Sequence, residues 1–215
     1  MSVLVYAIST DDARAPASSE LHEICAAGLR ALAEPVAARP PADIEQLVRY
    51  EETVETIMQS HTILPMRFGS VLDSADQVRE LLRTRASEFQ STLEHLAGAI
   101  EYGLRVSAPH EPSDSDDDRT YGGPGETYMR RRLAQQSRSQ ELRAWLDSEL
   151  GGLVRDCNYR AMPDAETSLS AAFLVDRLLE HDFRDRVTEI SKTTDHGLSW
   201  SGPWPPYSFA AGVHG

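Results

Sequence analysis

Three aspartates at alternate positions, Asp114, Asp116 and Asp118, are the feature most suggestive of chemistry, because D-x-D-x-D opens a calcium-binding loop. The rest of that loop pattern does not follow. Arg119 stands where the loop has the glycine of its sharp turn, and Gly125 stands where it has the bidentate glutamate. We therefore interpret the segment as a solvated acidic loop and expect no metal site there.

Three glycines just before an expected helix, Gly122, Gly123 and Gly125, suggest a phosphate-binding turn. Such a turn needs a strand immediately before it and, in the P-loop, a Lys-Ser or Lys-Thr pair after it. The sequence has neither, and the nearby carboxylates would repel a phosphate. We expect no nucleotide or phosphate cofactor.

Nucleophiles and metal ligands are scattered along the chain. The seven histidines include no pair at i, i+4 and have no cysteine alongside, and no serine lies in a G-x-S-x-G motif. Cys25 and Cys157 are too few for a disulfide framework, which favours reduced thiols in a cytoplasmic protein. We expect no catalytic, metal or cofactor-binding residues, and a protein that is not an enzyme.

The composition is that of a globular protein with an acidic surface. The 215 residues are 40% hydrophobic and 26% charged, with a formal net charge of −13. That charge disfavours nucleic acid and anionic lipid membranes as partners. No apolar run is long enough to span a bilayer, and the N-terminal MSVLVYAIST lacks the basic region of a signal peptide.

Apolar periodicity in the first half predicts a small N-terminal α+β domain over residues 1–97. The expected elements are a strand at 3–8, a helix from Ser18 or Ser19 to about Ala33, a helix after the N-cap Asp43, a strand at 61–72 interrupted at Pro65, and a long helix from Asp73 or Ser74 to about Ala97.

Residues 98–215 predict a second domain with the order β-α-β-β-α-β, which is a modified ferredoxin-like arrangement. The expected strands are 100–106, 153–159, 168–175 and one from Gly197; the expected helices are 126–149 and 178–192. The acidic loop, 108–126, is an insertion in this domain, and an aromatic and proline-rich tail ends it. The fold class is therefore α+β.

That tail, SGPWPPYSF at residues 201–209, contains Pro203-x-x-Pro206, formally a PxxP ligand for an aromatic-lined groove. We favour the alternative that its aromatic residues pack back on the protein, because large rings dominate core energetics. Burial of Trp204 would then make Trp204→Ala cost about 3–5 kcal/mol. The candidate structural or partner-binding residues here are Trp204, Pro205, Pro206, Tyr207 and Phe209.

A second set of candidates lies in LPMRFG, residues 64–69. Gly69 is expected to adopt a turn conformation that other residues resist, and Pro65 to stiffen the approach to it. Arg67, which precedes Phe68, is the one charged residue in an apolar run. It should therefore be paired or lie at the surface. Its role is either a structural salt bridge or contact with a partner.

HTILPMRFGSVL, AIEYGLRV, GETYMRRRL, SLSAAFLVDR and SGPWPPYSF, in this order and spacing, resemble the gas vesicle protein L/F family. VLVYAIS and ELHEICAAGLRALAEPV resemble its N-terminal part, so the resemblance covers nearly the whole chain. LPMRFG and GPWPPYSF are its most specific motifs. The resemblance implies a two-domain α+β fold whose second domain is a modified ferredoxin-like fold.

The resemblance also implies a minor component or accessory factor of gas vesicles, with the hydrophobic major shell protein and other accessory proteins as partners and no cofactor. We expect a cytoplasmic, non-enzymatic assembly factor that binds the shell protein, limits its aggregation and supports vesicle nucleation. One alternative is a structural component retained in the finished wall. A weaker alternative is a regulator that binds a ligand or peptide on its ferredoxin-like sheet.

Overall fold

A computed structural model describes residues 1–10, 21–107, 124–162 and 169–210. The aspartates of the acidic loop, Gly122, Gly123 and the expected helix caps Ser18 and Ser19 lie outside these residues. The chain divides into two compact units. The first contains Met1–Glu101 together with the chain from Pro203 onward, and the second is Tyr102–Gly202.

The first unit is built on a sheet with β1 at its centre, in the order β2-β3-β1-β4, and β5 also pairs with β1. The strands are β1 (Ser2–Thr10), β2 (His22–Ala26), β3 (Leu29–Val36), β4 (Leu64–Pro65) and β5 (Val71–Leu72). β1 is buried without interruption from Val3 to Ser9, which indicates that both of its faces are covered.

A hairpin, β2 and β3, replaces the helix that was predicted to end near Ala33, so that prediction was wrong. The hairpin turns at Ala27 and Gly28, whose φ angles are 54° and 72°. Two left-handed residues in succession match the twist of antiparallel strands. β3 then pairs antiparallel with β1 along its whole length, and this pairing buries Leu29 and Leu32.

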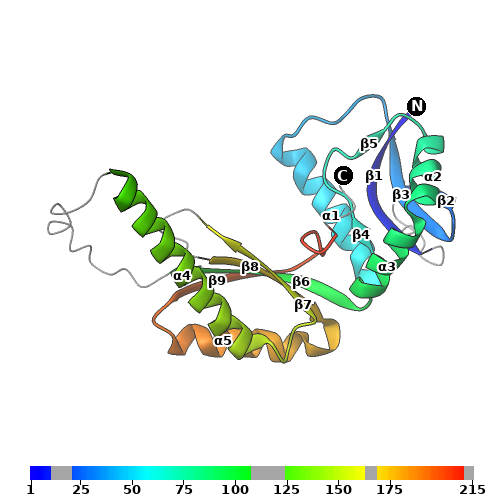
Figure 1. Cartoon of the computed structure of the whole chain (residues 1–215). Helices are drawn as coiled ribbons and strands as arrows, with labels where there is room; N and C mark the ends of the chain where they lie inside the picture. Colours follow the sequence, from blue (N-terminus) through cyan, green and yellow to red (C-terminus); the bar gives the residue numbers. More distant parts are fainter. Residues whose placement is uncertain (11–20, 108–123, 163–168, 211–215) are drawn as a thin grey trace. The chain divides into compact units, whose positions relative to one another are not determined.

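Three helices pack against this sheet, with α1 on β1, α2 on β2 and β3, and α3 on β1 and β4 (Figure 1). They are α1 (Ile44–Ser60), α2 (Ala75–Thr84) and α3 (Ala86–Leu96). The Asp43 side chain caps α1, as predicted, by accepting a 2.9 Å bond from the Gln46 backbone N–H. The predicted long helix to Ala97 is interrupted at Arg85, where φ is −113° and ψ is 21°.

The second unit has the predicted element order β-α-β-β-α-β, and its strands lie in the order β7-β8-β6-β9. The elements are β6 (Ala99–Ser107), α4 (Pro124–Leu150), β7 (Asp156–Ala161), β8 (Leu169–Asp176), the short 3₁₀ helix η1 (Arg177–Leu179), α5 (Glu180–Thr193) and β9 (Gly197–Trp204). α4 and α5 contact each other and the sheet (Figure 1). The buried rings of Tyr102, Phe173 and Phe183 form its aromatic core.

The two units together confirm the predicted α+β class. The end of the chain departs from the predicted boundaries, because residues 203–210 belong to the first unit and not to the second. Among the described residues, no helix combines the length and the apolar character needed to cross a membrane.

Candidate functional site

The LPMRFG motif forms β4 and the turn that follows it. Pro65 is buried beside β1, where it pairs with Ala7. Gly69 has a φ of +80°, the left-handed geometry expected of it. Its carbonyl oxygen accepts bonds from Nε and Nη2 of Arg39, at 3.0 and 2.6 Å. The turn is therefore fixed both by its glycine and by a cation from another part of the chain.

The two residues at the centre of this turn differ in environment. Arg67 is exposed and forms no ion pair with any described residue, so the structural salt bridge considered for it is not present in that part of the chain. Phe68 is half-buried and packs edge-on against Tyr50, with ring centroids 5.3 Å apart. The motif thus presents a cation at the surface beside a partly exposed ring.

Tyr50 of α1 holds the motif against β1. Its ring is 1% exposed and stacks on Tyr6 at 4.6 Å, and its hydroxyl donates toward the carbonyl oxygens of Met66 at 2.8 Å and Val5 at 3.0 Å. One phenol therefore links a helix, the central strand and the start of the turn. Buried carbonyl groups of this kind are costly to leave without a donor.

The C-terminal tail is anchored in the same unit by two carboxylates. The Tyr207 hydroxyl donates to both oxygens of Glu51 at 3.2 Å. The backbone N–H and the hydroxyl of Ser208 donate to the two oxygens of Glu101, at 2.8 and 2.7 Å. Glu101 is only 8% exposed. Each carboxylate fixes one tail residue by paired contacts.

Burial sets the electrostatics of these anchors. It raises the pKa of Glu101 above the ordinary value, although the bonds from Ser208 act in the opposite direction. Burial likewise raises the pKa of Glu51, and the Tyr207 bond opposes that change. Both tail contacts therefore depend on carboxylates that are partly desolvated.

The prediction that Trp204 is buried was wrong, because its side chain is 42% exposed. Pro205 and Pro206 are buried instead, and Tyr207 and Phe209 are half-buried. Pro206, the second proline of the PxxP motif, is therefore not displayed to a groove on another protein, which argues against the PxxP interpretation. The tail packs back on the protein as predicted, through its buried prolines and through the hydrogen bonds of Tyr207 and Ser208.

Both motifs meet at adjacent residues of α1, since Tyr50 holds the LPMRFG turn and Glu51 holds the tail. Neither these two residues nor Glu101 were predicted from the sequence. Glu101 carried a usable signal, because it is a carboxylate inside the apolar run AIEYGLRV of a predicted strand. Glu51 carried none, since helix α1 has several other glutamates with the same local pattern.

The described contacts anchor the LPMRFG turn and the tail, and they leave a cation at the surface. These contacts contain no nucleophile held by a base. Within the described ranges, no group of three or more His, Cys, Asp or Glu side chains is placed to hold a metal ion. Apart from the half-buried rings of Phe68 and Phe209, the predicted site residues therefore fall into two classes. Pro65, Gly69, Pro205, Pro206 and Tyr207 fix the backbone, whereas Arg67 and Trp204 reach the surface.

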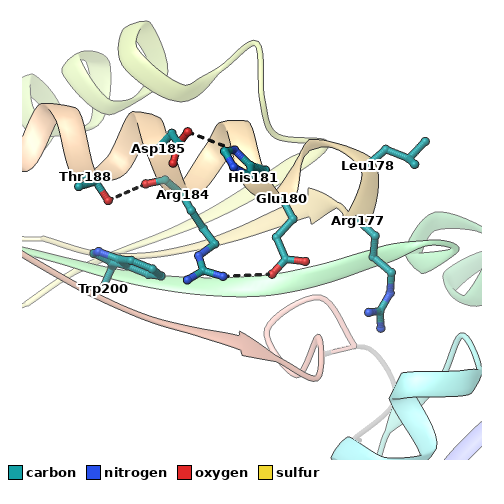
Figure 2. Close-up of a pocket in the computed structure, with 8 residues that line it drawn as sticks. All are labelled: Arg177, Leu178, Glu180, His181, Arg184, Asp185, Thr188 and Trp200. Atoms are coloured by element: carbon teal, nitrogen blue, oxygen red, sulfur yellow. Dashed lines mark hydrogen bonds and ion pairs between the residues drawn. The ribbon is translucent and has the colours of Figure 1, made fainter.

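A separate groove of about 520 Å³ lies in the second unit, between α5 and β9. Figure 2 shows Arg184 reaching from α5 toward Glu180 and lying near Trp200 of β9. The Arg184 guanidinium is 5.7 Å from the Trp200 ring centroid, and Glu180 accepts a 2.8 Å bond from the Tyr102 hydroxyl. Leu178, at one end of the groove, is 95% exposed.

Comparison with known proteins agrees with both units. Crystal structures of gas vesicle protein GvpF from Anabaena sp. PCC7120 and Microcystis aeruginosa are similar, with TM-scores of 0.76 and 0.78. Each match covers 97% of this chain, and 95% and 98% of those chains, at 20% and 16% identity. At such identities the likeness establishes the fold.

Sequence comparison identifies the family. Gas vesicle protein L of Streptomyces sp. (strain CB03234) is 31% identical over 165 residues, which are 68% of this chain and 62% of that protein. The match thus spans less than two thirds of that relative's length. The family model described as gas vesicle synthesis protein GvpL/GvpF matches residues 2–211. Because this match extends over both units and the tail, the chain belongs to the GvpL/GvpF family of gas vesicle synthesis proteins.

Proposed function

We propose that this protein is a non-enzymatic assembly factor that binds the major gas vesicle shell protein, limits its aggregation and supports vesicle nucleation. The family match over residues 2–211 carries the proposal, because it indicates an accessory role in gas vesicles. In this proposal the protein acts in the cytoplasm, at the forming vesicle, together with other accessory proteins. It has two domains, the second of them a modified ferredoxin-like domain with an acidic loop insertion.

Physical chemistry supports such a role. A shell protein that presents an apolar face to gas will self-associate once it is made, because large exposed apolar surfaces drive association. A partner with a net charge of −13 keeps the complex dispersed by mutual repulsion while it covers that face.

The LPMRFG turn supplies the surface that we propose meets a partner. Arg67 is exposed and without an ion pair among the described residues, and Phe68 beside it is half-buried. A guanidinium next to an aromatic ring is a combination that interfaces favour. Its presence in a turn held rigid by Tyr50 and Arg39 reduces the entropy lost on binding.

A pull-down from cells that express the complete vesicle gene cluster tests the function. We expect the shell protein to be recovered with the wild-type chain, and the Arg67→Ala variant to recover less while melting at the same temperature. Arg79→Ala is the matched control, because the Arg79 side chain is 41% exposed and, among the described residues, its ion pair is with Asp76 on its own helix. Recovery of no shell protein by the wild-type chain contradicts the proposal, as does normal vesicle formation after its deletion.

The fate of the protein after assembly separates the assembly role from the wall role. Intact vesicles washed stringently should lose an assembly factor. Retention after such washing favours the alternative, a structural component of the finished wall.

A further inference from the structure

Two helices of the described chain each leave a pair of large apolar side chains exposed to solvent. The pairs are Ile44 and Val48 on α1, and Met129 and Leu133 on α4, with exposed fractions between 47% and 76%. Residues four apart lie on the same face of a helix, so each pair forms a short apolar stripe. We call these the α1 stripe and the α4 stripe.

The α1 stripe is flanked by carboxylates. Glu45 and Glu52 lie three and four residues from Val48, and both are exposed. Arg49 is the nearby cation, and it is paired with Glu34 at 3.4 Å. The residues of α1 that pack in the core lie on its opposite side: Tyr50, Val54, Ile57 and Met58. The stripe therefore faces solvent in acidic surroundings.

The α4 stripe is flanked by arginines. Arg130 lies three residues before Leu133, Arg132 lies three residues after Met129, and both arginines are exposed. Arg130 pairs with Glu126 at 2.6 Å, but both side chains are more than half exposed, and such a surface pair contributes little energy. Residues 124–138 contain four arginines and one glutamate, a local excess of positive charge in an acidic chain.

The first half of α4 adds little to the core of its own unit. The described residues of α4 that are buried all lie in its second half: Ser139, Leu142, Leu146 and Leu150. In Figure 1 the first half extends away from α5. Gln135, on the other side of the helix from the α4 stripe, donates a 2.6 Å bond to the Met162 carbonyl oxygen. The stripe itself is thus left to solvent.

We propose that the α4 stripe of one copy of this chain packs on the α1 stripe of a second copy. The apolar side chains then cover each other, and arginines beside one stripe face glutamates beside the other. Two chains with a net charge of −13 repel each other in most orientations, so the opposite charges at this contact favour one arrangement. The inference concerns self-association and does not depend on binding of the shell protein.

Complementarity within the one chain identifies the occupant. Every copy carries one acidic and one basic stripe of the same apolar spacing, so each copy supplies what the other lacks. Two residues on each side make a small contact, at the low end of interface sizes, below about 1,200 Å². We therefore expect a weak association that depends on concentration. It brings several LPMRFG turns together, which raises their effective concentration toward a common partner.

Sedimentation velocity over a range of concentrations tests self-association. The α1 variant carries Ile44→Ser and Val48→Ser, and the α4 variant carries Met129→Ser and Leu133→Ser. We expect the wild-type chain to form larger species as its concentration rises. Each variant should associate at least about tenfold more weakly, because burial of one large apolar side chain is worth about that factor.

Leu178→Ser is the matched control, because Leu178 is an exposed apolar residue of η1, outside both stripes. We expect it to associate as the wild-type chain does. A wild-type chain that stays monomeric at every concentration overturns the inference. Stripe variants that associate as strongly as the wild-type chain overturn it as well.

A mixture of the two variants tests which helices meet. Each variant retains one intact stripe, so equal amounts of the two should form a one-to-one dimer that neither forms alone. Absence of that dimer, when the wild-type chain does associate, contradicts the pairing of α4 with α1. The dimer should weaken as salt is added, because screening reduces the attraction between the flanking charges. A dimer of equal strength at low and high salt contradicts the assigned charge complementarity.

The shell protein is the other occupant that these measurements distinguish. If the wild-type chain stays monomeric and the α1 variant or the α4 variant loses binding of purified shell protein, the stripe binds the shell protein and the inference is wrong. If the wild-type chain associates through the stripes and binds no shell protein, the inference holds while the proposed function fails.

Discussion

Removal of one hydroxyl group, in Tyr50→Phe, tests how the LPMRFG turn is held. The ring stays and keeps its stack on Tyr6, so the change removes the hydroxyl bonds to the carbonyl oxygens of Met66 and Val5 and the longer 3.5 Å contact with that of Tyr6. A net hydrogen bond contributes about 1 kcal/mol, and a buried carbonyl left without its donor costs about 1–3 kcal/mol. We expect a loss of about 1–3 kcal/mol in the free energy of unfolding.

Urea denaturation measures this loss, and thermal melting should show a fall of about 2–10 °C for a chain of this size. Tyr159→Phe is the matched control, because its hydroxyl donates at 2.6 Å to Asp147 in an exposed position where water can replace it. We expect that variant to lose less than about 1 kcal/mol. Losses that are equal in the two variants refute the assignment of Tyr50 as the anchor of the turn.

Three further changes test the rest of the account. Trp204→Ala should cost clearly less than the roughly 3–5 kcal/mol of a fully buried aromatic, since its side chain is 42% exposed; a denaturation loss inside that range would show that the ring is buried in solution. Gly69→Ala should cost about 1–3 kcal/mol in the same assay, because its φ of +80° is strained for other residues; a loss near zero would mean that the turn relaxes. Glu101→Gln should flatten the pH dependence of stability. Burial raises the pKa of Glu101, so the stability gained from its proton is complete below the unfolded pKa and is lost as pH rises through the folded pKa. Denaturation from about pH 4 to about pH 7 measures that slope, and equal slopes in variant and wild type would contradict the assignment.

The sequence predicted the second unit well because its signals are local. β6, β8 and α5 have clear apolar patterns of their own, and the order of the expected elements led to β-α-β-β-α-β. The first unit was less predictable. Ile24, Leu29 and Leu32 fit a helical stripe, yet they lie in a hairpin whose formation depends on pairing with β1, a contact distant in sequence. An Ala-Gly turn is also a weaker hairpin signal than Asn-Gly or Asp-Gly.

The candidate residues show the same limit. Gly69 was found because a left-handed turn favours one residue type, whatever surrounds it. Trp204 was placed wrongly because residue type gives an average burial, whereas its actual exposure depends on where the buried prolines direct the chain. The anchors Glu51 and Glu101 are 156 and 107 residues away from their tail partners, so no local pattern connects them.

Aggregation of the purified shell protein, followed by light scattering after dilution from denaturant, tests the central claim most directly. With an equimolar amount of this protein present, the account predicts slower scattering and recovery of a dispersed complex of the two chains. An equally acidic, unrelated protein is the control for charge alone. Scattering that rises at the same rate with this protein as with the control, and no complex in the supernatant, would contradict the account.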